Sequence, residues 1–261
     1  MGATRTPARI DVNCDMGEGF GAYSLGLDAD IIPHVTSANI ACGFHAGDPA
    51  WMRATVSLAE RHRVGVGAHP GFPDLRGFGR RVLQASPAEI TDDLVYQIGA
   101  LAAFTRGKRL QHVKPHGALY NLAVEREDVA RAIGHAVLEV DRDLILVVLA
   151  GSPWERVARA MGLRVAREVF ADRLVDARGA LVPRAVPGAV VHDAARVVER
   201  SLRLVVEHRV TAVTGEELEL HADTICLHGD TPGAVSLAAS LREAFDRAGI
   251  GVVPMAELAA V

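Results

Sequence analysis

Four histidines follow short apolar runs along this chain, usually beside glycine, proline or aspartate: His45, His69, His116 and His228. A fifth run ends in Asp15. Imidazole and carboxylate groups can act as general acids and bases or as metal ligands. A barrel of parallel strands gathers the polar residues at its strand C-termini into one active site. We therefore expect one site that is assembled from much of the chain.

Polar residues alternate with apolar ones in the first of these segments. Asp11, Asn13 and Asp15 lie two residues apart, so a strand places all three side chains on one face. Polar groups on an otherwise buried strand are costly unless they have partners or a function. An edge strand with one face in water is the structural alternative. We favour a role for this face in binding a substrate or a metal ion.

Lys114 and His116 give the clearest local indication of a functional site, because a spacing of two residues lets both side chains face the same barrel mouth. This would place a fixed cation beside a general acid or base. His45 and His69 follow two earlier strands in equivalent positions, whereas Asp48 is explained by helix capping alone. The predicted catalytic residues are Asp15, His45, His69, Lys114 and His116. The residues leave open whether a metal is bound, and the candidate ligands are Asp15, His45 and His69.

Further charged residues suit substrate binding. An arginine at the mouth, Arg173, could hold a carboxylate or phosphate, although an ordinary ion pair with Asp172 explains it equally well. His228 and Asp230 precede an expected helix N-terminus, which attracts anions. The predicted substrate-binding residues are Asp11, Asn13, Glu168, Arg173, His228 and Asp230.

Strands and helices alternate along the chain in a way that can position these residues. Apolar runs predict strands at 10–14, 35–42, 64–68, 110–114, 144–150, 164–170 and 223–228. Capping residues followed by proline predict helix starts between them, at Asp48, Ser86, Ser152 and Thr231. Such repeats form parallel sheets, either open or closed. Because at least five strands contribute polar ends, we predict a seven-stranded parallel β/α barrel rather than an open sheet.

Composition narrows the classes of function. We expect one domain over residues 1–261, with residues 1–9 disordered and a small hairpin inserted at 210–222. The net charge of -4 gives no reason to expect nucleic acid binding. No run reaches the roughly 18 apolar residues of a membrane helix, and no signal peptide is recognisable. Three cysteines, an odd number, indicate reduced thiols in a cytoplasmic protein.

The chain resembles the LamB/YcsF lactam-utilisation family in six segments, over residues from about 10 to 255. They read Asp-x-Asn-Cys-Asp-x-Gly-Glu, Ala-Asn-Ile-Ala-Cys-Gly-Phe-His-Ala-Gly-Asp-Pro, Gly-Ala-His-Pro, Val-Lys-Pro-His-Gly-Ala-Leu-Tyr-Asn, Glu-x-Phe-Ala-Asp-Arg and Leu-His-Gly-Asp-Thr-Pro. The resemblance implies a barrel like that of glycoside hydrolases and polysaccharide deacetylases. It also implies hydrolysis of the cyclic amide 5-oxoproline to L-glutamate, driven by hydrolysis of Mg-bound ATP to ADP and phosphate. The partners would be subunits B and C of such a 5-oxoprolinase.

That reaction suggests roles for the predicted residues. An unactivated lactam needs activation, such as phosphorylation of its oxygen, before water attacks. His116 or His69 would be the general base, Lys114 would stabilise charge on the oxygen, and Arg173 would bind the substrate carboxylate. One alternative is a stand-alone metal-dependent deacetylase or amidohydrolase. Another is a non-catalytic subunit that binds the lactam for its partners. No phosphate-binding loop in the sequence identifies the subunit that binds ATP.

Overall fold

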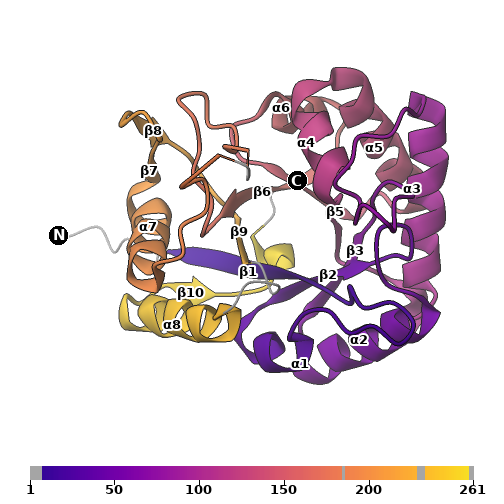
Figure 1. Cartoon of the computed structure of the whole chain (residues 1–261), viewed down its shortest axis with the longest axis horizontal. Helices are drawn as coiled ribbons and strands as arrows, with labels where there is room; N and C mark the ends of the chain where they lie inside the picture. The colour runs from indigo at the N-terminus through magenta and orange to yellow at the C-terminus, as the bar shows by residue number, and fades with distance from the viewer. Residues whose placement is uncertain (1–7, 184–185, 228–232, 259–261) are drawn as a thin grey trace.

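Seven parallel strands close into a barrel in the computed structural model, which describes residues 8–183, 186–227 and 233–258 (Figure 1). Around the barrel the strands run in the order β1, β2, β3, β4, β5, β6 and β9, and β9 pairs with β1 to close the ring. The strands are β1 (Arg9–Met16), β2 (Ser37–Ala41), β3 (Gly65–His69), β4 (His112–Val113), β5 (Ile145–Leu149), β6 (Arg164–Phe170) and β9 (Thr224–Leu227). The predicted barrel is confirmed, with all seven predicted strands in it.

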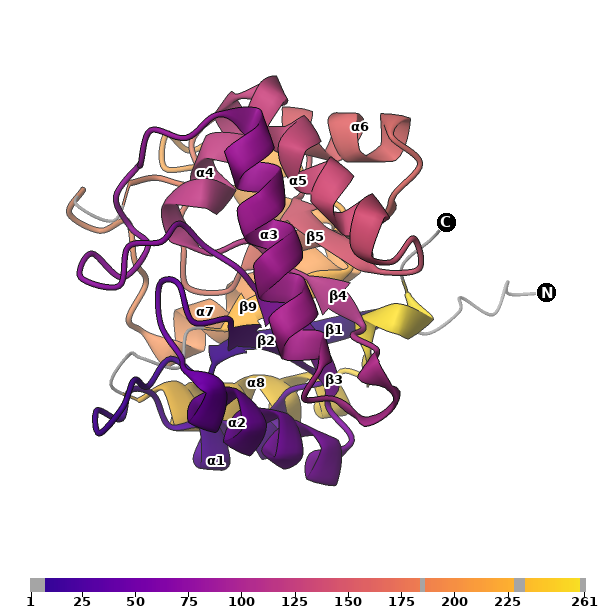
Figure 2. The same ribbon diagram turned by 90° about the vertical axis from the view of Figure 1, so that its right-hand side faces the viewer.

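Helices surround the ring of strands (Figure 1). They are α1 (Asp28–Ile31), α2 (Pro49–His62), α3 (Pro87–Ala102), α4 (Gly117–Glu125), α5 (Glu127–Val140), α6 (Pro153–Ala160), α7 (Ala194–Glu207) and α8 (Ala234–Arg247). Three short 3-10 helices are η1 (Ile32–His34), η2 (Arg106–Lys108) and η3 (Met255–Glu257). Figure 2 shows α3 crossing the outer side of the barrel beside α5, with which it packs. None of the helices in the described residues is long and apolar enough to cross a membrane.

Side-chain caps start the helices that follow three of the strands. Asp48 accepts hydrogen bonds from the first turn of α2, and Ser86 forms a reciprocal capping box with Glu89 at the start of α3. Ser152 caps α6 through the backbone N–H of Glu155. The predicted cap Thr231 lies outside the described residues. These caps fix where each loop at the strand C-termini ends, and therefore how the site residues on those loops are held.

Polar side chains fill much of the barrel interior, where branched apolar residues are usual. The strand register pairs Asn13 with Ser37 and Asp15 with Asn39, so their side chains point to the same side. Part of the interior is apolar, with a small cluster formed by Ile145, Val147, Ala166 and Met255. The main hydrophobic core instead lies between the outer face of the strands and the helices, which leaves the interior for the polar residues of the site.

Three short strands of the described residues lie outside the ring. β7 (Arg209–Thr211) and β8 (Glu217–Glu219) form an antiparallel pair between α7 and β9, in the segment where a hairpin is predicted. β10 (Gly251–Val252) pairs in parallel with the first residues of β1, and no sequence signal predicted it. It brings the chain back to the N-terminal end of the barrel, where η3 follows.

Candidate active site

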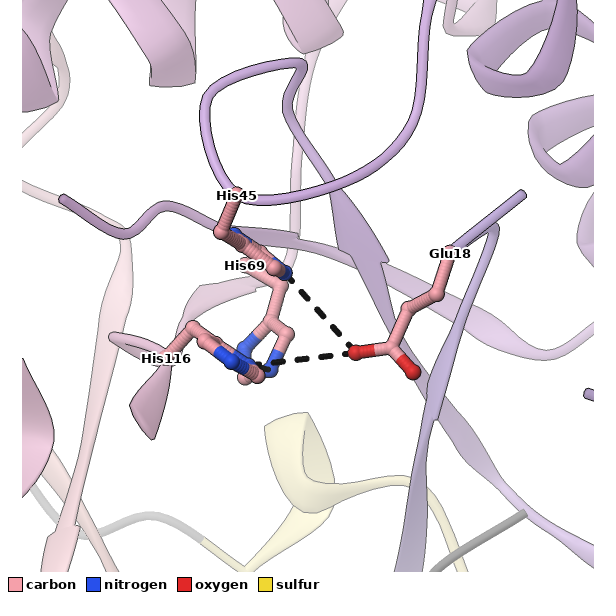
Figure 3. Close-up of side chains that lie close together, drawn as sticks. All are labelled: Glu18, His45, His69 and His116. Atoms are coloured by element: carbon pink, nitrogen blue, oxygen red, sulfur yellow. Dashed lines mark hydrogen bonds and ion pairs between the residues drawn. The ribbon is translucent and has the colours of Figure 1, made fainter. Parts of the chain in front are cut away.

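Three histidines and one glutamate meet at the C-terminal ends of four successive strands (Figure 3). Glu18 follows β1, His45 follows β2, His69 is the last residue of β3, and His116 follows β4 as the first residue before α4. The His45 and His116 rings stack with their centroids 3.8 Å apart, and the His69 ring stands perpendicular to both. All three rings are buried, with at most 4% of each residue exposed. The cluster is therefore a built feature of the barrel mouth.

Backbone carbonyls orient two of these rings. His69 Nδ1 lies 2.6 Å from the Lys114 carbonyl oxygen, and His116 Nε2 lies 2.8 Å from that of Phe78. A carbonyl only accepts hydrogen bonds, so both nitrogens donate. In a neutral ring this leaves the lone pair on His69 Nε2 and on His116 Nδ1, two atoms that are 2.9 Å apart. Both are available to a proton, a substrate or a metal ion.

Carboxylates stand next to these lone pairs. Asp15 Oδ2 is 3.3 Å from His69 Nε2. Glu18 Oε1 is 3.7 Å from His45 Nε2 and 3.8 Å from His116 Nδ1 (Figure 3). Burial lowers the pKa of His116 to about 3, and burial together with the neighbouring His116 and His69 holds the pKa of His45 well below its usual range. Both rings are therefore neutral at neutral pH, as a base or a metal ligand must be.

Lys114 is the buried cation of the site. Its Nζ lies 3.0 Å from Asp15 Oδ1 and 2.9 Å from Glu168 Oε1. Burial acts to lower the pKa of Lys114, but the charges of Asp15 and Glu168 and the hydrogen bond to Cys226 hold it well above its usual range. The ammonium group also donates to Asn13 Oδ1 and to Cys226 Sγ. Lys114 is therefore charged, and its position is fixed from several sides.

Asn39 links this cation to the histidine at the base of the site. Its Nδ2 donates to Asn13 Oδ1 at 2.7 Å and to Asp15 Oδ1 at 2.9 Å, while its Oδ1 accepts from His112 Nε2 at 2.7 Å. A Cβ atom on Gly67 would meet the His112 ring at 2.1 Å, so only glycine in β3 leaves room for this ring. Asn39 thereby holds Asp15 in place between Lys114 and His69.

A pocket of about 380 Å³ opens beside the cluster, a volume suited to a small molecule. Its polar lining includes Asp15, Glu18, His69, Arg80, Lys114, His116, Tyr120 and Arg173. Arg173 is nearly buried and donates to the Val182 carbonyl, and Arg80 lies over the ring of Phe78. The three basic side chains in the pocket wall can bind an anionic group, and the carboxylates of Asp15, Glu18 and Glu125 lie in the same wall.

The structure brings all five residues predicted as catalytic to this end of the barrel. Glu168 and Asn13 lie just beneath Lys114, and Arg173 forms part of the pocket wall. His228 and Asp230 lie outside the described residues. Sequence reasoning did not identify Glu18, Asn39 or Arg80. Asn39 carries a detectable signal, because it is an amide inside an otherwise small and apolar run.

Asp11 is not part of the pocket, contrary to its predicted place at the barrel mouth. It is four residues before Asp15 on the same strand face, about 13 Å along an extended strand. Its carboxylate accepts hydrogen bonds from Ser37, Thr224, Thr36 and the backbone N–H of Met255 at the other end of the interior. The alternation of polar and apolar residues correctly predicts the face of the strand on which Asp11 lies. It does not predict how far from the barrel mouth the residue lies.

The similarity to known proteins extends over nearly the whole chain. The sequence model of the LamB/YcsF family matches residues 10–260. The A subunit of 5-oxoprolinase from Syntrophobacter fumaroxidans is 55% identical over 249 residues, which cover 95% of this chain and 98% of that protein. Its counterpart from Pyrococcus horikoshii is 51% identical over 251 residues, with the same coverage. The crystal structure of a lactam utilization protein from Thermus thermophilus matches with a TM-score of 0.90 and 48% identity, covering 94% of this chain and 99% of that one.

Proposed function

The chain belongs to the LamB/YcsF family, and we propose that it acts as the A subunit of an ATP-dependent 5-oxoprolinase. The reaction is hydrolysis of the lactam C–N bond of 5-oxoproline to give L-glutamate, coupled to hydrolysis of ATP to ADP and phosphate. The observation that carries the proposal is the 55% identity to such a protein over 95% of this chain and 98% of the relative. Subunits B and C are the proposed partners, and the three buried free thiols are compatible with a reducing cytoplasm.

The pocket suits this substrate in size and charge. 5-oxoproline is a five-membered lactam with one carboxylate, and the pocket of about 380 Å³ carries Arg80, Lys114 and Arg173 on its walls. We assign the substrate carboxylate to Arg173, whose planar guanidinium can hold a carboxylate through two parallel hydrogen bonds. The lactam oxygen would then face Lys114, whose ammonium group is buried and charged. Charge that develops on that oxygen is stabilised by a cation that needs no reorganisation.

The neutral histidines supply the proton transfers of the proposed reaction. Transfer of the γ-phosphoryl group of Mg-bound ATP to the lactam oxygen would make the ring carbon electrophilic. His69 Nε2 or His116 Nδ1, each with a lone pair and on a residue that lines the pocket, would take a proton from the attacking water. The C–N bond then breaks, and the nitrogen leaves with that proton as the amine of γ-glutamyl phosphate. A second water hydrolyses this acyl phosphate to glutamate and phosphate. The histidine ends the cycle neutral, as it began.

A stand-alone metal-dependent amidohydrolase is the second candidate function, and the cluster of Glu18 with the three histidines is the observation that favours it. The two candidates differ in their need for ATP and for partners. Glutamate release from 5-oxoproline should be measured with the chain alone and with subunits B and C, each with and without ATP. We expect release only with all three subunits and ATP. Release by the lone chain without ATP would instead support the amidohydrolase.

Lys114 provides the matched test of the site. The Lys114→Ala variant, assayed within the three-subunit complex, should lose at least about 100-fold in lactam-dependent ATP turnover, because a preorganised charge stabiliser is removed. Lys108→Ala is the control, since Lys108 is exposed and distant from the pocket. Circular dichroism should show both variants folded. Full turnover by a folded Lys114→Ala variant would refute the role of this residue.

A further inference from the structure

The lone pairs of His69 and His116 pose an electrostatic problem. Each ring donates its only proton to a carbonyl, so His69 Nε2 and His116 Nδ1 face one another over 2.9 Å as two acceptors. Two acceptors at hydrogen-bond distance repel unless a positive species lies between or beside them. Either a shared proton or a metal ion can supply that charge. The other residues of the cluster indicate whether a shared proton or a metal ion fits better.

A shared proton accounts for only part of the cluster. It would place a charged imidazolium in a buried position, where the charge has lost its hydration. It would also leave His45 unexplained. This ring is 0% exposed, and neither of its nitrogens has a hydrogen-bond partner within the described part of the chain. Glu18 Oε1 lies 3.7 Å from His45 Nε2, which is too far for a hydrogen bond. A buried imidazole without a hydrogen bond is costly, and a ligand bound to His45 would account for it.

A single metal ion accounts for all four residues. One ligand atom from each of Glu18, His45, His69 and His116 lies within 4.8 Å of the others. Tetrahedral zinc with bonds of about 2.0 Å places its ligand atoms about 3.3 Å apart. Three of the six separations are 2.9, 3.7 and 3.8 Å, and none exceeds 4.8 Å, so the side chains would have to move closer together around the ion. The Lys114 and Phe78 carbonyls hold two of the rings in the orientation that metal-bound histidines adopt.

We propose that Glu18, His45, His69 and His116 bind one divalent transition metal ion at the barrel mouth (Figure 3). Three imidazole nitrogens and a carboxylate select zinc and its neighbours over magnesium or calcium, which prefer oxygen. Glu18, His69 and His116 also line the pocket, so the ion stands at the pocket wall. The ion is distinct from the magnesium that accompanies ATP. The inference concerns binding alone and does not depend on the identity of the substrate. It competes with the general-base role proposed above for His69 and His116, because a nitrogen that binds the ion has no lone pair left for a proton.

Metal titration of the full-length chain tests the proposal. The purified chain is stripped with a chelator and titrated with Zn²⁺ by calorimetry, and its metal content is measured by elemental analysis after gel filtration. We expect one ion per chain. Glu18→Gln and His45→Gln should each bind at least about tenfold more weakly, because each removes a direct ligand. His135→Gln is the control, since His135 is exposed on α5, and it should bind like the wild type.

The outcomes separate a built site from surface binding. Absence of stoichiometric binding by the wild type would overturn the proposal and leave the shared proton as the explanation. Equal affinity in the wild type, Glu18→Gln and His45→Gln would also overturn it. Should His45→Gln fail to fold, Glu18→Gln still decides, because the Glu18 side chain is partly exposed and tolerates replacement. Cobalt gives an independent readout, because its visible absorption reports the ligands and should change in Glu18→Gln but not in His135→Gln.

Discussion

Arg173 is the residue whose proposed role depends most on side-chain shape. It is nearly buried, and its guanidinium donates to the Val182 carbonyl while its own backbone carbonyl accepts from Arg200. It is therefore held in one orientation at the pocket wall. A planar group held in this way can present two parallel donors to a carboxylate, which a lysine ammonium group cannot do.

Replacement by lysine separates this geometry from charge alone. We expect Arg173→Lys to raise the KM for 5-oxoproline about tenfold in the three-subunit complex, with a smaller change in kcat, because one charge-assisted hydrogen bond is lost. Arg80→Lys is the comparison, since Arg80 lines the same pocket but is exposed. Steady-state kinetics of both variants measure the effect. A rise in KM for Arg80→Lys alone would move the carboxylate to Arg80.

Residue types at the strand ends predicted most members of this candidate site, but they did not predict Glu18. His45, His69, Lys114 and His116 are recognisable because each is a titratable group at the end of a buried strand or within a few residues after it. Glu18 follows Gly17, whose φ of +69° is the left-handed conformation that glycine adopts readily. This turn directs Glu18 toward the histidines of three other strands. The sequence shows that a glycine is present, but the direction of the turn depends on contacts made elsewhere in the fold.

Helix α2 and the loop after β1 are joined at one carboxylate. Asp48 Oδ1 accepts from the backbone N–H groups of Ala50 and Trp51, which caps α2, while Oδ2 accepts from the N–H of Gly21. The Trp51 ring lies so close to Gly19 that a Cβ there would meet it at 2.3 Å. The loop that carries Glu18 is therefore held against the helix that follows His45. Capping, which explained Asp48 at the level of sequence, is only half of its role.

Removal of this carboxylate should affect both stability and the site. We expect Asp48→Ala to lower the free energy of unfolding by about 1 kcal/mol, the usual value of an N-cap, and to weaken zinc binding because the Glu18 loop is released. Ser86→Ala removes the cap of α3 at similar cost, but Ser86 does not contact the Glu18 loop. Urea unfolding and zinc titration of both variants distinguish the two effects. Equal loss of zinc affinity in both would show that only general stability matters.

A continuous polar network crosses the whole barrel interior. Thr224 donates to Asp11 and accepts from Asn13, which in turn accepts from Lys114. Lys114 pairs with Asp15, and Asp15 reaches His69. Such a network is costly to bury unless all its members are satisfied. The hydrophobic core outside the strands therefore supplies the stability of this fold, and the interior supplies the site. Composition shows that a core exists, but only the register of the strands shows which side of the sheet it occupies.

Asp11 makes the stability of the whole molecule depend on pH. Burial raises the pKa of its carboxyl group to about 6, against the effect of hydrogen bonds from three hydroxyl groups and one backbone N–H. Its value in the unfolded chain is about 3.9. Between these two values the folded protein holds a proton that the unfolded chain has lost. This contribution to stability is therefore fully present below about pH 4 and falls, by up to about 3 kcal/mol, as the pH rises through 6.

The Asp11→Asn variant should remove this dependence. An asparagine oxygen can accept from Ser37, Thr36 and the Met255 N–H as Oδ1 does now, and the Thr224 hydroxyl can accept from the new amide. Free energies of unfolding from urea titrations between pH 4 and 7 provide the measurement, with Asp30→Asn as a control on an exposed helix residue. We expect the wild type and the control to lose stability relative to Asp11→Asn as the pH rises. Parallel curves for all three proteins would show that Asp11 is already ionised in the fold at pH 4, because the donors around its carboxylate then outweigh the cost of burial.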